Sequence, residues 1–88
     1  QVLATLKAWN DAEYCARHLG RNAPLGEIDR SRMNVKGSSI AVGHPFAATG
    51  ARIAGNMAKL LAEKGSGRGL ISICTAGGRG VAAIMAAA

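Results

Sequence analysis

Acidic and aromatic residues are scarce in this chain. Five Asp and Glu stand against eleven Lys and Arg, which gives a net charge of +6, and there is one Trp, one Tyr and one Phe. The basic residues are dispersed, whereas a nucleic-acid surface gathers them on one face with aromatic side chains between them. We therefore expect no nucleic-acid binding, and a positive surplus that serves solubility or the phosphates of a small molecule.

Cysteine and long apolar runs are scarce as well. Cys15 and Cys74 have neither the spacing of a metal site nor the density of a secreted disulfide scaffold, so we expect reduced thiols and no metal. No apolar run approaches the ~20 residues of a membrane helix, and no charged-then-apolar leader is visible. These features favour a soluble, cytoplasmic protein without a membrane span.

The first third of the chain predicts two short helices, over residues 2–9 and 12–19. Asn10 and Glu13 have the spacing of a capping box for the second helix, and Gly20 ends it. Cys15 falls inside that helix among apolar neighbours, where a buried packing residue is expected rather than a reactive thiol. Residues 21–33 predict an exposed connection.

The rest of the chain predicts an α/β arrangement. A buried strand is expected over residues 38–42, an amphipathic helix between Pro45 and Gly65, and a hairpin of two strands over 70–74 and 81–85. A strand–helix–strand crossover places its two strands parallel, so that their carboxyl ends meet at one edge of the sheet. Open α/β sheets bind ligands at that edge.

His44 and Cys74 follow the two strands of this predicted crossover. A titratable ring and a thiol are therefore expected at the ligand-binding edge, each beside a glycine-rich turn whose backbone N–H groups can serve an oxyanion. The spacing alone leaves two alternatives open. His44 could only fill a loop, or His44 and Cys74 could lie apart in the folded chain.

Two stretches resemble a known family. Residues 34–50, NVKGSSIAVGHPFAATG, are similar to the histidine signature of the thiolases, and residues 69–82, GLISICTAGGRGVA, are similar to their carboxyl-terminal cysteine signature. The resemblance implies that residues 1–88 are a carboxyl-terminal fragment of the thiolase C-terminal domain. That domain has a mixed five-stranded sheet between helices, in the order 3-2-1-4-5, and strands 1 and 2 would be missing here.

The resemblance also implies roles for individual residues. His44 would activate a nucleophilic cysteine and help to hold the thioester oxyanion, and Cys74 would act as acid and base. The backbone N–H of Ala76 would serve the second oxyanion hole. The family usually has glycine at this position, so alanine suits it only if the turn needs no positive φ there. Gly43, Phe46 and Gly77 would contact the substrate.

The implied function is that of a 3-ketoacyl-CoA thiolase, which splits 3-ketoacyl-CoA with CoA into acyl-CoA and acetyl-CoA in fatty acid β-oxidation. CoA is a substrate, and no cofactor is implied. The segments 46–48 and 74–76 resemble the long-chain branch of the family. Implied partners are the rest of a thiolase chain, further copies in a homodimer or tetramer, and a hydratase–dehydrogenase subunit.

These residues hold only part of a thiolase site. The family's nucleophilic cysteine and its Asn-Glu-Ala-Phe or His-Glu-Ala-Phe motif are absent, so the fragment alone is expected to be inactive and, with a two-strand gap in its sheet, unstable. Two alternatives compete with this interpretation. A ketoacyl synthase shares the fold but lacks the cysteine–glycine turn around Cys74, and a non-catalytic remnant would only bind CoA, acyl chains or a partner subunit.

Overall fold

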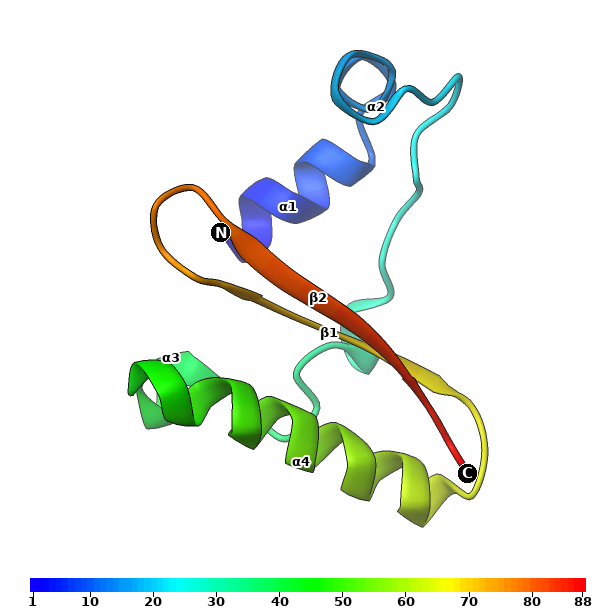
Figure 1. Cartoon of the computed structure of the whole chain (residues 1–88). Coiled ribbons are helices and arrows are strands. Elements are labelled where there is room, and N and C mark those ends of the chain that lie inside the picture. Colours follow the sequence, from blue (N-terminus) through cyan, green and yellow to red (C-terminus); the bar gives the residue numbers. More distant parts are fainter. The chain divides into compact units, whose positions relative to one another are not determined.

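All 88 residues are described by a computed structural model, in which they form two compact units, residues 1–35 and residues 36–88. The first unit holds α1 (Val2–Trp9), α2 (Ala12–Leu19) and the short 3-10 helix η1 (Arg30–Arg32). The second unit holds α3 (Ser39–Val42), α4 (Phe46–Lys64), β1 (Arg68–Cys74) and β2 (Gly80–Ala86) (Figure 1).

In the first unit, the two helices that the sequence predicts are present, and they pack on Cys15. This side chain is fully buried, and its Sγ lies 3.6 Å from the carbonyl oxygens of Ala8 and Trp9. The expectation of a buried packing cysteine is confirmed. The expected cap of α2 is wrong by one residue, because Asp11 and not Asn10 accepts the Tyr14 N–H, at 2.9 Å.

The connection after α2 turns back toward α1. Gly20 ends α2 in the left-handed conformation, with φ 62°, as the sequence predicts. The Gly26 N–H then donates to the Trp9 carbonyl at 3.1 Å. Asp29 begins η1 by accepting from the Ser31 N–H and hydroxyl, at 3.0 and 2.7 Å.

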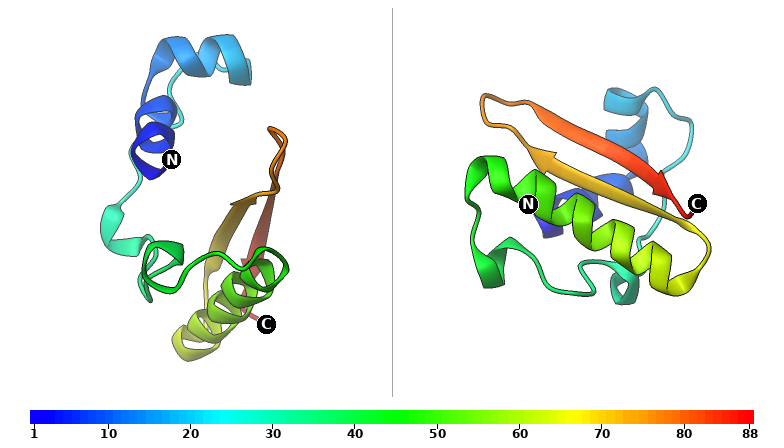
Figure 2. Two further views of the ribbon diagram at one scale, coloured as in Figure 1. Left: turned by 90° about the vertical axis from the view of Figure 1, so that its left-hand side faces the viewer. Right: turned by 60° about the horizontal axis from the view of Figure 1, so that its bottom comes forward.

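In the second unit, α4 lies along a two-stranded antiparallel sheet (Figures 1 and 2). The helix ends at Gly65, φ 77°, and the chain returns through a short loop into β1, so that helix and strand run in opposite directions. Leu61 of α4 is buried, and Ile71 and Ile73 on one face of β1 are half-buried. The predicted amphipathic helix and hairpin are confirmed.

The strand predicted over residues 38–42 is wrong, because Ser39–Val42 form a short helix, α3. The Ala41 and Val42 N–H groups both donate to the Ser38 carbonyl, at 2.9 and 3.2 Å. The physical reason is that a strand needs a neighbour for its backbone groups, and the only strands present pair with each other. Without a neighbour, local bonds satisfy these groups. The predicted parallel crossover is therefore absent.

The sheet has one covered and one open face. Leu70 and Ile84 lie directly opposite each other on the face away from α4, and they are 52% and 72% exposed. Two apolar side chains on a bare sheet face have no covering layer within this unit. No helix of the chain combines the length and the apolar content needed to cross a membrane.

Candidate functional site

His44 lies in the short connection between α3 and α4. Gly43 ends α3 with φ 83°, a conformation that favours glycine, and Pro45 stands immediately before α4, where its missing N–H costs nothing. Nδ1 of His44 lies 2.6 Å from the hydroxyl oxygen of Thr49. The imidazole also meets Phe46 edge-on, with ring centroids 5.5 Å apart. These contacts leave Nε2 without a partner within the chain.

Cys74 is the last residue of β1, where it pairs with Gly80 at the closed end of the hairpin. Its thiol is free and exposed. The turn that follows is closed by two backbone bonds: the Thr75 N–H donates to the Arg79 carbonyl at 2.9 Å, and the Arg79 N–H donates to the Ala76 carbonyl at 3.2 Å. The thiol therefore lies beside a hydrogen-bonded turn.

The turn needs left-handed backbone at three successive positions. Ala76, Gly77 and Gly78 have φ of 62°, 62° and 72°. Alanine was expected to suit position 76 only if the turn needs no positive φ there, and Ala76 has one. The left-handed conformation costs a residue with a β-carbon about 1–2 kcal/mol. None of the three backbone N–H groups is used in a bond within the chain. They are free to donate to an oxyanion, which is the role expected of Ala76.

His44 and Cys74 belong to the same end of the second unit. His44 precedes α4 and Cys74 ends β1, and the start of α4 lies at the end of the sheet where the hairpin turns (Figures 1 and 2). The sequence predicts that two parallel strands bring His44 and Cys74 to one edge. In the structure, a helix and a strand that run in opposite directions bring them to one end of the unit. No hydrogen bond joins the two residues, so their catalytic roles stay predictions.

Two polar residues in the first half of α4, Thr49 and Arg52, were not among the predicted site residues. Thr49 is only 3% exposed, and the Arg52 Nη2 donates to the Ser39 hydroxyl at 3.1 Å while its Nε is buried without a partner. A signal for Thr49 was present: it lies four residues before Ile53, on the apolar side of a predicted amphipathic helix. A polar residue at such a position needs a partner.

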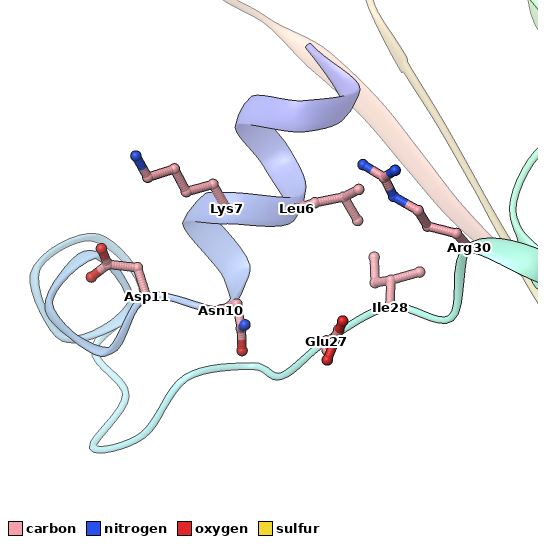
Figure 3. A pocket seen from close by; sticks show the side chains of 7 residues that line it. All are labelled: Leu6, Lys7, Asn10, Asp11, Glu27, Ile28 and Arg30. Atoms are coloured by element: carbon pink, nitrogen blue, oxygen red, sulfur yellow. The ribbon is translucent and has the colours of Figure 1, made fainter.

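The first unit has a separate hollow of about 580 Å³, which holds none of the predicted site residues. Figure 3 shows Leu6 and Ile28 facing this space from α1 and from the returning connection. Two basic and two acidic residues line it, so the formal charges of its lining sum to zero. The lining is Leu6, Lys7, Asn10, Asp11, Glu27, Ile28 and Arg30. No cluster of three or more His, Cys, Asp or Glu that could hold a metal ion is present in the chain.

Comparison with known proteins gives a consistent match over nearly the whole chain. The family model of the thiolase C-terminal domain matches residues 3–87. A 3-ketoacyl-CoA thiolase of Pectobacterium carotovorum is 51% identical over 85 residues, which are 97% of this chain and 20% of that protein. Proteins of the same name from Shewanella sp. W3-18-1 and Shewanella sediminis are 47% and 46% identical over the same shares. The chain thus spans one fifth of the length of these relatives.

Proposed function

Because this chain belongs to the thiolase C-terminal domain family, we propose that it supplies the histidine and the acid–base cysteine of a 3-ketoacyl-CoA thiolase. The observation that carries the proposal is the placement of His44 and Cys74 at one end of the second unit, each at the end of a helix or strand. The names of the relatives support the substrate class, a 3-ketoacyl-CoA thioester in fatty acid β-oxidation.

In the first half of the proposed reaction, the nucleophilic cysteine comes from a part of the protein outside these residues. Nε2 of His44 takes the proton of that thiol, and the thiolate attacks the 3-keto carbon of the substrate. The bond between C2 and C3 then breaks, leaving an acyl group on the cysteine and an enolate of acetyl-CoA. Cys74 donates its Sγ proton to C2 of the enolate, and acetyl-CoA leaves.

In the second half, CoA enters and gives its thiol proton to the Cys74 thiolate. The CoA thiolate attacks the acyl-enzyme, acyl-CoA is released, and the nucleophilic cysteine recovers its proton from His44. A thiol suits this work because the ordinary pKa of cysteine, about 8.5, allows both donation and acceptance near neutral pH. The free N–H groups of Ala76 and Gly77 would stabilise the thioester oxygen as it gains charge.

The surroundings of the site fit the same proposal. Phe46 is 85% exposed beside His44 and is the residue we propose to meet the acyl chain or the pantetheine arm, while Gly43 allows the substrate to approach the backbone. CoA acts as a substrate, and no cofactor or metal is part of the proposal. We place the complete enzyme in the cytoplasm as a homodimer or tetramer that can pair with a hydratase–dehydrogenase subunit.

The open sheet face supports a larger fold around this segment. Leu70 and Ile84 are expected to be covered by the rest of a thiolase chain, with the hairpin as two strands of a five-stranded mixed sheet. A non-catalytic segment that only binds CoA or a partner subunit is the alternative, since these residues lack a nucleophilic cysteine motif.

The test uses a full-length chimera, in which these 88 residues replace the matching segment of the Pectobacterium carotovorum thiolase. We expect the chimera to cleave 3-ketoacyl-CoA, followed by the loss of substrate absorbance. His44→Ala and Cys74→Ser should each lower kcat by about 10²- to 10⁴-fold, the usual contribution of a positioned acid or base. The matched control Cys15→Ala, which changes the buried thiol, should keep its kcat. Near-normal thiolysis by either site variant contradicts the assignment.

A further inference from the structure

Thr49 is a buried polar residue with a single partner. It lies in the first turn of α4, is 3% exposed, and its only side-chain bond joins Oγ1 to Nδ1 of His44 at 2.6 Å. The other polar side chains bonded in this unit, those of Ser39 and Arg52, bond to each other instead. A buried hydroxyl without a partner is unfavourable, so Thr49 and His44 each restrict the other.

The role that Nδ1 takes in this contact determines the state of the other ring nitrogen of His44. A neutral imidazole has one nitrogen that donates and one that accepts, and the bond made by the first sets the state of the second. When Nδ1–H donates to Thr49 Oγ1, Nε2 carries the free lone pair that removes a proton. Once Nε2 is protonated, the same threonine oxygen accepts from the imidazolium and stabilises its charge.

We propose that Thr49 is a positioning residue, which holds the His44 ring and its tautomer so that Nε2 acts as the base. This inference rests on the proposed function, in which His44 activates the nucleophilic cysteine. Thr49 itself touches neither substrate nor nucleophile in this role. Its site in α4 suits the task because a helix holds a side chain more rigidly than the loop that carries His44.

The test compares Thr49→Val with Thr49→Ser in the full-length chimera. Valine keeps the shape of the side chain and removes the hydroxyl, so kcat should fall about 10- to 100-fold with KM within about twofold, as expected for one hydrogen bond to a charged group. Serine keeps the hydroxyl and should restore kcat to within about threefold. Thr5→Val, at an exposed site on α1, is the matched control and should leave kcat unchanged. Equal kcat for Thr49→Val and the parent overturns the inference, and so does an equal loss in the serine and valine variants.

A double-mutant cycle separates positioning from general damage. If Thr49 acts through His44, Thr49→Val should lower kcat by less than about twofold when it is added to His44→Ala. A further loss of about 10-fold or more in that background would show that Thr49 supports something other than the ring, and would overturn the inference. Failure of the proposed function gives a different result, because His44→Ala itself would then keep normal activity.

Discussion

The thioether of Met57 on α4 lies directly against the α-carbon of Gly69 on β1. A β-carbon built at position 69 would contact Sδ and Cε of Met57 and lie 3.0 Å from its Cγ. A larger residue here would make the Met57 side chain move, whereas the backbone angle of Gly69 is one that other residues adopt. The missing side chain at position 69 therefore lets α4 pack closely on β1 at this point.

Gly69→Ala should lower the free energy of unfolding of the chimera by about 1 kcal/mol, because Met57 must move out of its packed position. Urea unfolding measures the change. Gly55→Ala is the matched control: a β-carbon added to this exposed glycine of α4 would meet nothing within 4 Å, and alanine there should raise the stability by up to about 1 kcal/mol. A stabilising Gly69→Ala would contradict the close packing of α4 on β1.

Ala76→Gly should raise the stability of the chimera by about 0.5–1 kcal/mol. Relief of the left-handed strain contributes about 1–2 kcal/mol, and the extra freedom of glycine in the unfolded chain removes part of that gain. Turnover should be kept, because the proposed oxyanion donor is a main-chain N–H. Ala58→Gly, at an exposed position in α4, should instead lower stability by about 1 kcal/mol. Equal losses at both positions would mean that Ala76 is unstrained.

The stabilisation that Asp29 gives to the start of η1 should be lost at acidic pH. The Ser31 hydroxyl and N–H donate to its carboxylate, and Arg32 adds positive charge, so the pKa of Asp29 lies below its ordinary value. A lowered folded pKa means that the stabilisation is present above the unfolded pKa of about 3.9 and is lost as the pH falls through the folded pKa.

Carbon-detected NMR titration of the Asp29 carboxyl checks this dependence. Ser31→Ala removes the hydroxyl donor and should raise the pKa of Asp29 toward its ordinary value. Asp29→Asn should remove the local acid transition seen at the Ser31 amide. An Asp29 carboxyl that titrates in the ordinary range in the parent chain would rule out the capping role.

The 88 residues alone should not unfold cooperatively as a monomer. Only Cys15, Thr49 and Leu61 are buried, whereas Leu70 and Ile84 share an open sheet face. So few buried side chains cannot offset the conformational entropy of an ordered chain. Amide exchange should be fast in β1 of the isolated chain, and slow amides in both β1 and β2 of a monomer would contradict this expectation.

Leu70 on the open sheet face allows a test in two settings, the isolated chain and the chimera. The comparison shows whether the longer chain covers this face. Leu70→Lys should make the isolated chain more soluble, because it removes exposed apolar surface. In the chimera it should lower the yield of folded protein, because the face is then expected to be covered and a buried lysine is costly. The same effect of Leu70→Lys in both settings would mean that the face stays open in the longer chain.

Local signals predicted most of the secondary structure, because they act within a few residues. The apolar period of α4, the glycines after α2 and α4 and the glycine-rich turn of the hairpin all indicated the right elements. The strand predicted over residues 39–42 was wrong because apolar and β-branched side chains indicate burial only. Whether such a segment forms a strand or a helix depends on the elements beside it. For the candidate site, both the predicted crossover and the family resemblance pointed to His44 and Cys74, and their catalytic roles stay predictions. Thr49 was missed because its importance lies in a contact made five residues away.

The loop between α4 and β1 determines how much length variation the segment can accept. Gly65 and Gly67 hold its two ends, and the Gly67 carbonyl accepts the Ala87 N–H at 3.0 Å, so the loop is tied to the end of β2. An inserted residue that is not absorbed as a bulge would slide Cys74 about 3.3 Å along the strand direction relative to the start of α4. Surface loops usually accept insertions and deletions freely. This loop is an exception, because it sets the alignment of the opposite end although it lies a whole helix length away from it.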